Sequence, residues 1–231
     1  TTTYKKGLKE GPQKEFIEGV VLIEQRTFKK DSLDGEWTSW HDNGTQKVVR
    51  VYKNGQPRGN WMFYDPKGAW MREEQYKKGL ADGIWTFYDK QGVKEKEILF
   101  ADGLDTLHTY YSSNGNKLKE GKMVDGKEEG NWTFYDENGV KERETEHKSG
   151  QEEGIYTLFY DNGQMEVQGP YANKLRIGKW TWWYETGEKW KEGDYADDQQ
   201  RDGTWSVWNK DGSLIEESIY RSGEFQSKKK Y

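Results

Sequence analysis

Histidine is the residue in this sequence that most often acts as a metal ligand or general base, and it occurs three times, as His41, His108 and His147. Both roles need further groups that converge on the ring. The three histidines lie in different segments, and His108 and His147 stand where similar segments carry a tryptophan and a tyrosine. We interpret these two as ring replacements and predict no catalytic residue, no metal site and no cofactor.

Carboxylates are the second candidate for chemistry, because a suitably spaced pair serves as acid and base in glycosidases. Here the carboxylates recur at one equivalent position of six segments instead of forming a single pair. Such repetition favours cross-strand charge pairing on a solvated sheet over catalysis. The column consists of Glu73, Glu97, Glu120, Glu144, Glu192 and Glu217.

Motifs for other chemistries are missing from the sequence. There is no cysteine, which excludes disulfide frameworks and thiolate chemistry. No phosphate-binding G-x-x-x-x-G-K-[ST] loop and no G-x-S-x-G nucleophile elbow occur. The D-x-x-G segments that begin at Asp65, Asp89 and Asp136 lack the alternating acidic ligands of a calcium loop, so we interpret them as turns.

All these residues belong to a repeated segment, of which GNWTFYDENG at 130–139 is one copy. The first glycine of the segment recurs every 23 to 25 residues, with Thr106 in its place once. A fixed period of this length is the mark of a repeat protein. The recurring glycines are Gly35, Gly59, Gly83, Gly130, Gly154, Gly178 and Gly203.

Each repeat predicts a β-hairpin. Alternation places Trp132 and Phe134 on one strand face, and Thr133 and Tyr135 on the other. Asp136 then begins a turn that a glycine completes. We therefore predict an all-β fold, an elongated, twisted antiparallel meander of about nine β-hairpin repeats of 24 residues.

The predicted organisation is a single repeat domain over residues 1–231. Residues 4–27 form an eroded first unit, because YKKGLKEG at Tyr4 matches YKKGLADG at Tyr76. Residues 28–223 form eight further units, and 224–231 form a basic tail.

Composition limits the class of protein. The chain of 231 residues has 33% charged residues and a mean hydropathy of −1.22, but a net charge of only −5. We expect it to fold around its 12 tryptophans and 15 tyrosines. Interspersed lysine and glutamate argue against nucleic-acid binding, and no apolar run approaches the roughly 18 residues of a membrane span.

The G-x-W-x-x-Y-x-x-x-G core, the following K-E-x-x-Y and the closing Y-x-x-G-x-x-x-G resemble MORN-variant repeats, as in the YwqK-type antitoxin family of bacteria. The resemblance covers about residues 4–223. It implies a β-hairpin scaffold used for protein interaction. Repeats that bind choline or glucan in cell walls differ, because they pair adjacent Trp-Tyr-Tyr at a shorter period.

Two rows of rings follow from the repeat, and we interpret most of them as core. Partner binding is predicted where the pattern is exceeded, in the ring-rich stretch from Trp180 to Trp190, at Trp70, and in the irregular unit 100–122. The acidic junction 196–202 is also irregular. The predicted partner-binding residues are Trp70, Trp180, Trp182, Trp183, Tyr184, Trp190, His108, Tyr110 and Tyr111.

These patterns favour a non-catalytic β-repeat scaffold that binds another protein, as an accessory or plugging subunit of a larger bacterial cell-envelope assembly. Two alternatives stay open, glycan or cell-wall binding through the tryptophan cluster and antitoxin-like neutralisation of a partner protein. The chain begins at Thr1 without methionine. We therefore lean toward an exported, periplasmic protein and leave a cytoplasmic location open.

Overall fold

The computed structural model describes residues 2–18, 21–196 and 200–231, and these residues form strands and turns without a helix. None of them therefore forms a helix of the length and apolarity that crossing a membrane takes. Contacts divide the chain into two compact units, Thr1–Gly115 and Asn116–Tyr231, here called the N-terminal and the C-terminal unit. The prediction of an all-β antiparallel meander of hairpin repeats is confirmed, and that of a single repeat domain stays a prediction.

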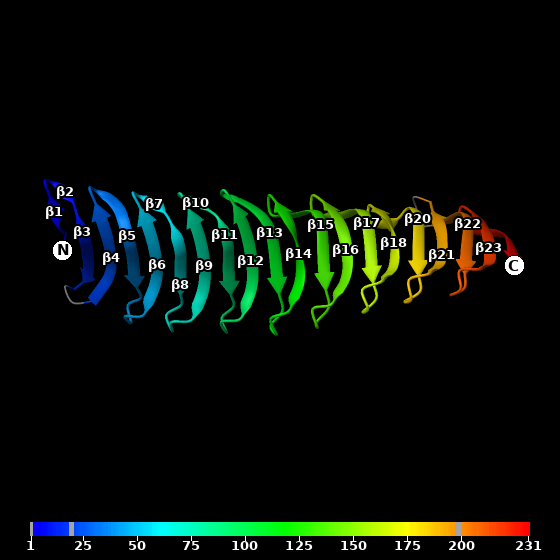
Figure 1. Cartoon of the computed structure of the whole chain (residues 1–231), viewed down its shortest axis with the longest axis horizontal. Helices are drawn as coiled ribbons and strands as arrows, with labels where there is room; N and C mark the ends of the chain where they lie inside the picture. The colour runs from blue at the N-terminus through cyan, green and yellow to red at the C-terminus, as the bar shows by residue number, and fades with distance from the viewer. Residues whose placement is uncertain (1, 19–20, 197–199) are drawn as a thin grey trace. The chain divides into compact units, whose positions relative to one another are not determined.

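In the N-terminal unit, strands that follow one another in the chain pair side by side and antiparallel (Figure 1). The first two strands form a small hairpin of their own. The strands are β1 (Tyr4–Lys5), β2 (Leu8–Lys9), β3 (Gly11–Ile17), β4 (Val21–Lys29), β5 (Ser32–Trp40), β6 (Gln46–Lys53), β7 (Gln56–Pro57), β8 (Gly59–Tyr64), β9 (Trp70–Lys77), β10 (Leu80–Ala81), β11 (Gly83–Tyr88), β12 (Lys94–Ala101) and β13 (Leu104–Tyr111).

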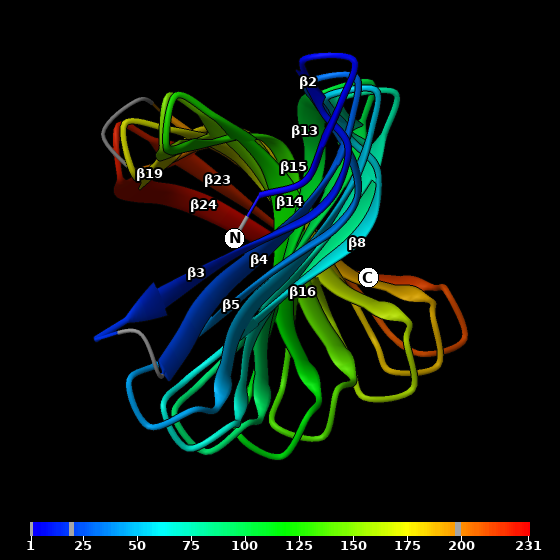
Figure 2. The same cartoon turned by 90° about the vertical axis from the view of Figure 1, so that its left-hand side faces the viewer.

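The C-terminal unit has the same meander order, and its hairpins fan out progressively, as a twisted sheet requires (Figure 2). The predicted basic tail is the last strand of this sheet. The strands are β14 (Lys117–Val124), β15 (Lys127–Tyr135), β16 (Lys141–Lys148), β17 (Gln151–Phe159), β18 (Met165–Ala172), β19 (Leu175–Arg176), β20 (Gly178–Trp183), β21 (Lys189–Tyr195), β22 (Arg201–Trp208), β23 (Leu214–Arg221) and β24 (Glu224–Lys230).

Two kinds of turn close the hairpins. In the predicted D-x-x-G turn between β15 and β16, Asp136 Oδ1 accepts hydrogen bonds from the backbone N–H of Asn138 and Val140, at 2.9 and 2.8 Å. Between β16 and β17, Ser149 and Gly150 both have positive φ, 52° and 83°. Two such residues twist the backbone in the sense that a tight hairpin needs. The turn interpretation of the D-x-x-G segments is therefore confirmed at Asp136.

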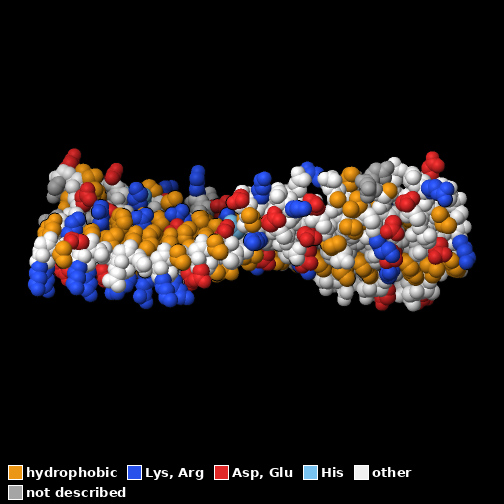
Figure 3. Space-filling view, turned by 90° about the horizontal axis from the view of Figure 1, so that it is seen from above, with side chains coloured by type: hydrophobic (Ala, Val, Ile, Leu, Met, Phe, Trp, Pro, Cys, Tyr) orange, Lys and Arg blue, Asp and Glu red, His pale blue; other side chains and the backbone are white. Residues whose placement is uncertain are grey.

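One edge of the N-terminal unit is basic, because its two-residue turns are rich in lysine. Figure 3 shows a band of hydrophobic side chains over this unit, bordered by a row of lysine and arginine side chains. The turns at this edge recur with the repeat, one per hairpin. Lys6, Lys30 and Lys78 lie in these turns. The strands before the turns end in Lys5, Lys29, Lys53 and Lys77.

One row of tryptophans packs along a single face of the sheet in each unit, and we call this face the tryptophan face. The row consists of Trp37, Trp61, Trp85, Trp132, Trp180 and Trp205. In the N-terminal unit Trp61 lies against Tyr76, with ring centroids 4.4 Å apart. In the C-terminal unit Trp132 Nε1 donates a hydrogen bond to the Lys122 carbonyl oxygen at 3.1 Å, and Trp205 Nε1 donates one to the Asp194 carbonyl oxygen at the same distance. Each indole thus buries a ring and satisfies its one donor on the neighbouring strand.

Glycine decides how deeply a tryptophan is buried. In the C-terminal unit Trp132 and Trp180 are 0% exposed, and a methyl group added to the glycine across from each would meet the indole. Those glycines are Gly121 and Gly169. In the N-terminal unit Arg50 occupies the equivalent position, and the tryptophan beside it is only half-buried. Because Gly121 and Gly169 have no side chain, the indole ring across from each can lie flat on the backbone.

We expect Gly121→Ala to lower the free energy of unfolding by about 1–3 kcal/mol, because overpacking a filled site has costs of that size. The new methyl group would lie 2.3 Å from Trp132 Cδ2. Urea unfolding followed by tryptophan fluorescence measures the change.

The control is Ser218→Ala, at the equivalent position of the last repeat, where Lys228 and not a tryptophan lies opposite on β24. This change removes one hydroxyl group and is expected to have a cost below about 1.5 kcal/mol. An equal effect of the two changes would contradict the packing role of the glycine.

Candidate functional site

Three indole rings lie side by side on the tryptophan face of the C-terminal unit. Trp182 lies between Trp180 and Trp205, with ring centroids 6.2 and 5.6 Å away. Trp182 comes from β20, and its cross-strand partner on β21 is Lys191. The aliphatic stem of a lysine in this position covers the neighbouring rings, as long cationic side chains do on apolar surfaces.

Three cations accompany these rings. Lys191 Nζ lies 4.2 Å from the ring centroid of Trp182 and 5.5 Å from that of Trp205. Arg201 Cζ lies 4.6 Å from the centroid of Trp205. These distances are within the range of cation–π attraction. The third cation, Arg176, has its Cζ 4.6 Å from the centroid of Trp180. We call these three cations and three indoles the cation–tryptophan cluster.

No carboxylate neutralises the cluster among the residues that the structure describes. Arg201 Nη1 instead donates a hydrogen bond to the Tyr220 hydroxyl at 3.0 Å. The side chain of Arg176 bonds to the hydroxyls of Tyr171 and Tyr195. Burial, followed by the nearby positive charges of Arg201 and Arg176, lowers the pKa of Lys191. The cluster therefore holds like charges close together.

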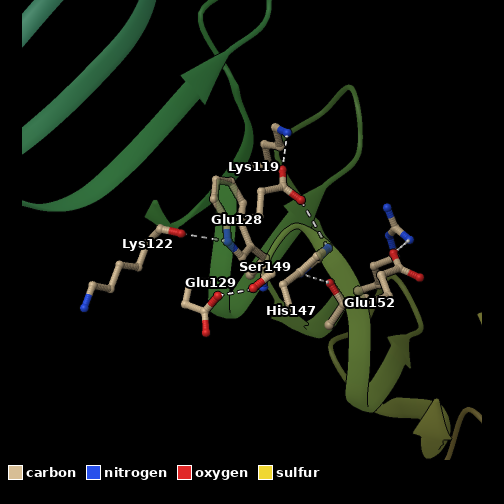
Figure 4. A network of polar contacts seen from close by, with 10 residues as sticks. Lys119, Lys122, Glu128, Glu129, His147, Ser149 and Glu152 are labelled. Carbon is tan, nitrogen blue, oxygen red and sulfur yellow. Dashed lines mark hydrogen bonds and ion pairs between the residues drawn. The ribbon is translucent and has the colours of Figure 1, made fainter. Parts of the chain in front are cut away.

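The two preceding repeats of the same unit are neutralised at the equivalent place (Figure 4). Lys119 Nζ lies 2.7 Å from Glu128 Oε1, and the other oxygen of Glu128 lies 3.1 Å from His147 Nε2. Arg143 pairs with Glu152 at 3.1 Å. Each cation on one strand thus meets a carboxylate on the next.

The charge at one repeat position is reversed between these repeats and the cluster. The residue two positions before the first glycine is Glu128 and then Glu152, but it is Arg176 and Arg201 in the following repeats. Lys191 therefore faces an arginine where its counterpart Arg143 faces a glutamate. These cations were not among the residues predicted from sequence, although aligning the repeats on their glycines shows the reversal.

Two of the predicted residues, Trp182 and Trp190, give access to the cluster from solvent. Trp190 is the extra residue of a β-bulge in β21 and is 40% exposed. Its ring centroid lies 6.1 Å from that of Tyr184 and 5.3 Å from Lys191 Nζ. Trp182 is half-buried, whereas Trp180 is fully buried and belongs to the core. Trp183 accepts a hydrogen bond on its carbonyl oxygen from Tyr160.

The other predicted residues belong to the N-terminal unit and are not part of the cluster. Trp70 is 41% exposed and packs against Tyr64 with a centroid distance of 5.2 Å. His108 is buried, with Nε2 3.0 Å from Asp105 Oδ2. Tyr110 and Tyr111 lie beneath lysine ammonium groups at 5.2 and 3.9 Å. Of the irregular junction 196–202, residues 197–199 lie outside the described residues.

The N-terminal unit has an apolar hollow of about 500 Å³ at the same place in its repeat. Phe63, Met71 and Arg72 line it, and they are the repeat equivalents of Trp182, Trp190 and Lys191. Arg72 Nε lies 2.7 Å from Glu74 Oε1, so this cation is neutralised within the chain. Gly193 occupies the position of Glu74 in the cluster's repeat. The cluster has therefore lost this counterion too.

Chemistry that needs a bound metal finds no support in the described part of the chain, where no three His, Cys, Asp or Glu side chains are grouped as ligands. The six predicted column glutamates act instead in local contacts. Lys189 and Glu192, for example, are 2.7 Å apart. What the cluster can do is hold an anion against aromatic surface.

We expect Arg201→Glu to raise the pKa of Lys191 and to stabilise the fold. A lysine whose pKa is lower in the folded than in the unfolded chain destabilises the fold at neutral pH, and this effect disappears as the pH rises through both pKa values. Replacing a like charge with a carboxylate removes part of it, by up to about 1 kcal/mol for an exposed pair. NMR titration of the Lys191 side chain and urea unfolding at pH 7 measure both effects.

The control is Arg221→Glu, which makes the same charge change on β23. Arg221 follows Tyr220 in the strand, so its side chain points to the opposite face. It should leave the pKa of Lys191 unchanged. If both substitutions shift this pKa equally, the effect is one of net charge and not of the cluster.

Comparison with solved structures gives only distant likenesses. The chain is 13% identical to a chain of the TcdB2–TccC3–Cdc42 crystal structure, with a TM-score of 0.24, and covers 92% of itself but 14% of that chain. It is 11% identical to a porin-like protein from Bacteroides uniformis, with a TM-score of 0.22, and covers 93% of itself and 92% of that chain. No match was found among curated proteins.

The family model of the MORN repeat variant matches four stretches of the chain, residues 33–54, 128–149, 152–173 and 176–197. One stretch lies in the N-terminal unit, and two others contain the neutralised repeats. The fourth spans Arg176, Trp182 and Lys191. The matches do not test the YwqK-type subfamily, which stays a prediction. The resemblance to the MORN repeat variant is confirmed for these four stretches.

Proposed function

We propose that this chain is a non-catalytic β-repeat scaffold that binds another protein through the tryptophan face of its C-terminal unit. The observation that carries the proposal is an exposed indole, Trp190, beside the unneutralised cations of the cation–tryptophan cluster. Tryptophan, tyrosine and arginine are the residues that most often dominate the binding energy of protein interfaces. On a hydrogen-bonded sheet they are held in place before the partner arrives, which lowers the entropy cost of binding.

The repeat pattern supports a non-catalytic role. An active site combines unlike groups that converge on one substrate. In this chain like residues recur in rows, such as the column of lysine–glutamate pairs that includes Lys141 with Glu144 and Lys189 with Glu192. In these pairs the lysine and the glutamate neutralise each other on the sheet surface.

More specific roles are extensions of the same proposal. An accessory or plugging subunit of a bacterial envelope assembly would use this face for permanent contact, and an antitoxin would use it to cover a partner's site. Glycan binding through Trp190 is the second candidate, because exposed indoles also stack on sugar rings. We favour a protein, because a neutral glycan would leave Lys191 and Arg201 without a counterion.

We expect Trp190→Ala to abolish or weaken capture of the partner by at least about tenfold, the effect of losing an interface hot spot. The substitution is on an exposed residue and should change stability by no more than about 0.5–1 kcal/mol. The measurement is co-purification with the tagged full chain from its native source, followed by mass spectrometry and by titration of the identified protein.

The matched control is Trp70→Ala, because Trp70 is 41% exposed against 40% for Trp190 and lies in the other unit. Its variant should capture the partner as the unchanged protein does. Equal capture by the Trp190 variant, or a chain that elutes with no other protein, would contradict the proposal. A fluorescence shift with cell-wall or storage polysaccharide that depends on Trp190 would favour the glycan alternative.

A further inference from the structure

The charge reversal between sister repeats points to the chemistry of the partner. In the repeats around Lys119 and Arg143, the chain supplies its own carboxylates from Glu128 and Glu152. In the repeats of the cluster, the same position carries an arginine. Lys191 therefore has Arg201 on the next strand where Arg143 has Glu152, and no described carboxylate pairs with it.

The cluster gains more from an anion than its neutralised counterparts could. Arg176 and Arg201 bond to tyrosine hydroxyls, which are neutral acceptors. Hydrogen bonds between charged partners are roughly twice as strong as neutral ones. Lys191 is half-buried between Trp182 and Trp205, where a positive charge is poorly hydrated. An entering anion would relieve the repulsion among all three cations at once.

The attraction is local to the cluster. The whole chain carries a net charge of −5, so its overall field repels polyanions. The basic turns of the N-terminal unit are a separate surface with exposed lysines, among them Lys30 and Lys78. The cluster combines three cations with three indole rings, and no carboxylate of the described residues pairs with them. A partner that fits it brings a small number of acidic groups and an apolar side chain for Trp190.

We propose that the cation–tryptophan cluster binds a carboxylate of the partner protein, an aspartate or glutamate side chain in a short acidic segment that supplies the counterion which Glu128 and Glu152 supply in the sister repeats. This inference rests on the proposed function and adds the chemical class of the partner's segment. Lys191 and Arg201 hold the carboxylate, Arg176 adds charge from β19, and Trp182 and Trp190 contact the apolar part of the segment.

The test uses the full chain and a blocked triglutamate peptide as the probe, with inorganic phosphate as a second probe at matched ionic strength. NMR follows the indole N–H signals of Trp182 and Trp205, because these report on the C-terminal unit and not on the lysine turns. The expected result is a saturable shift with triglutamate. A shift with phosphate alone would indicate that the cluster binds a phosphate and not a carboxylate, and would overturn the assignment.

Arg201→Glu restores the residue type of the sister repeats, so the variant should fold, and urea unfolding verifies this. We expect it to raise the dissociation constant for triglutamate at least about tenfold, because it reverses one of the contacting charges. The control Arg221→Glu changes the net charge equally and should leave the constant within about twofold. Equal weakening by both substitutions, or none by Arg201→Glu, would overturn the inference.

Partner capture separates this inference from the proposed function. Loss of capture in both the Trp190→Ala and the Arg201→Glu variant supports the two together. Loss in the Trp190 variant with full capture by the Arg201 variant leaves the protein-binding function standing and overturns the carboxylate. Full capture by both variants overturns the proposed binding face and, with it, the carboxylate.

Discussion

The packing of an indole ring flat against the neighbouring strand is the contact on which each unit depends. The sequence has few aliphatic residues, and a sheet must bury apolar surface somewhere to offset the entropy of ordering its chain. Trp132 and Trp180 do this on one face, fully shielded and with their N–H groups bonded to backbone carbonyls. The glycine beneath each ring is as necessary as the ring itself, because a side chain there would lift the indole into solvent.

This packing also determines where charge can be neutralised. In the repeat of Trp85, the position equivalent to Gly121 carries Glu74, and that carboxylate pairs with Arg72. The equivalent residue in the cluster's repeat is Gly193, which lets Trp205 reach 3% exposure and removes the counterion of Lys191. One substitution thus deepens the core and leaves a cation without its partner. The other position that supplies a carboxylate in sister repeats lies two residues before the repeat's first glycine. In the cluster this position carries Arg201.

The hairpins could be predicted from sequence, because their determinants are local. Glycines at a fixed period, a D-x-x-G turn and strict alternation of side chains specify two strands and the turn between them. The cluster could not be predicted in the same way. It depends on the register that places Trp182 across from Lys191 and on the bulge that exposes Trp190 while Trp180 is buried. Register and bulges arise between strands, and single-strand alternation does not encode them. The reversal from Glu152 to Arg176 was visible in the sequence, but only the cross-strand contacts give it meaning.

A repeat scaffold confines specificity to the places where copies differ. The shared positions must keep the ring packing and the turns, so they cannot vary without loss of stability, whereas positions beside the rings can change charge and size freely. At one such place the N-terminal unit has a hollow lined by Phe63 and Met71 with a neutralised arginine. At the same place the C-terminal unit has indoles and cations with which no carboxylate of the described residues pairs. Because the sheet supplies the same backbone to both, the difference in recognition lies in a few side chains. An acidic, partly apolar segment complements the surface of the C-terminal unit. It would find less attraction at the hollow of the N-terminal unit, because Arg72 is already paired with Glu74 there.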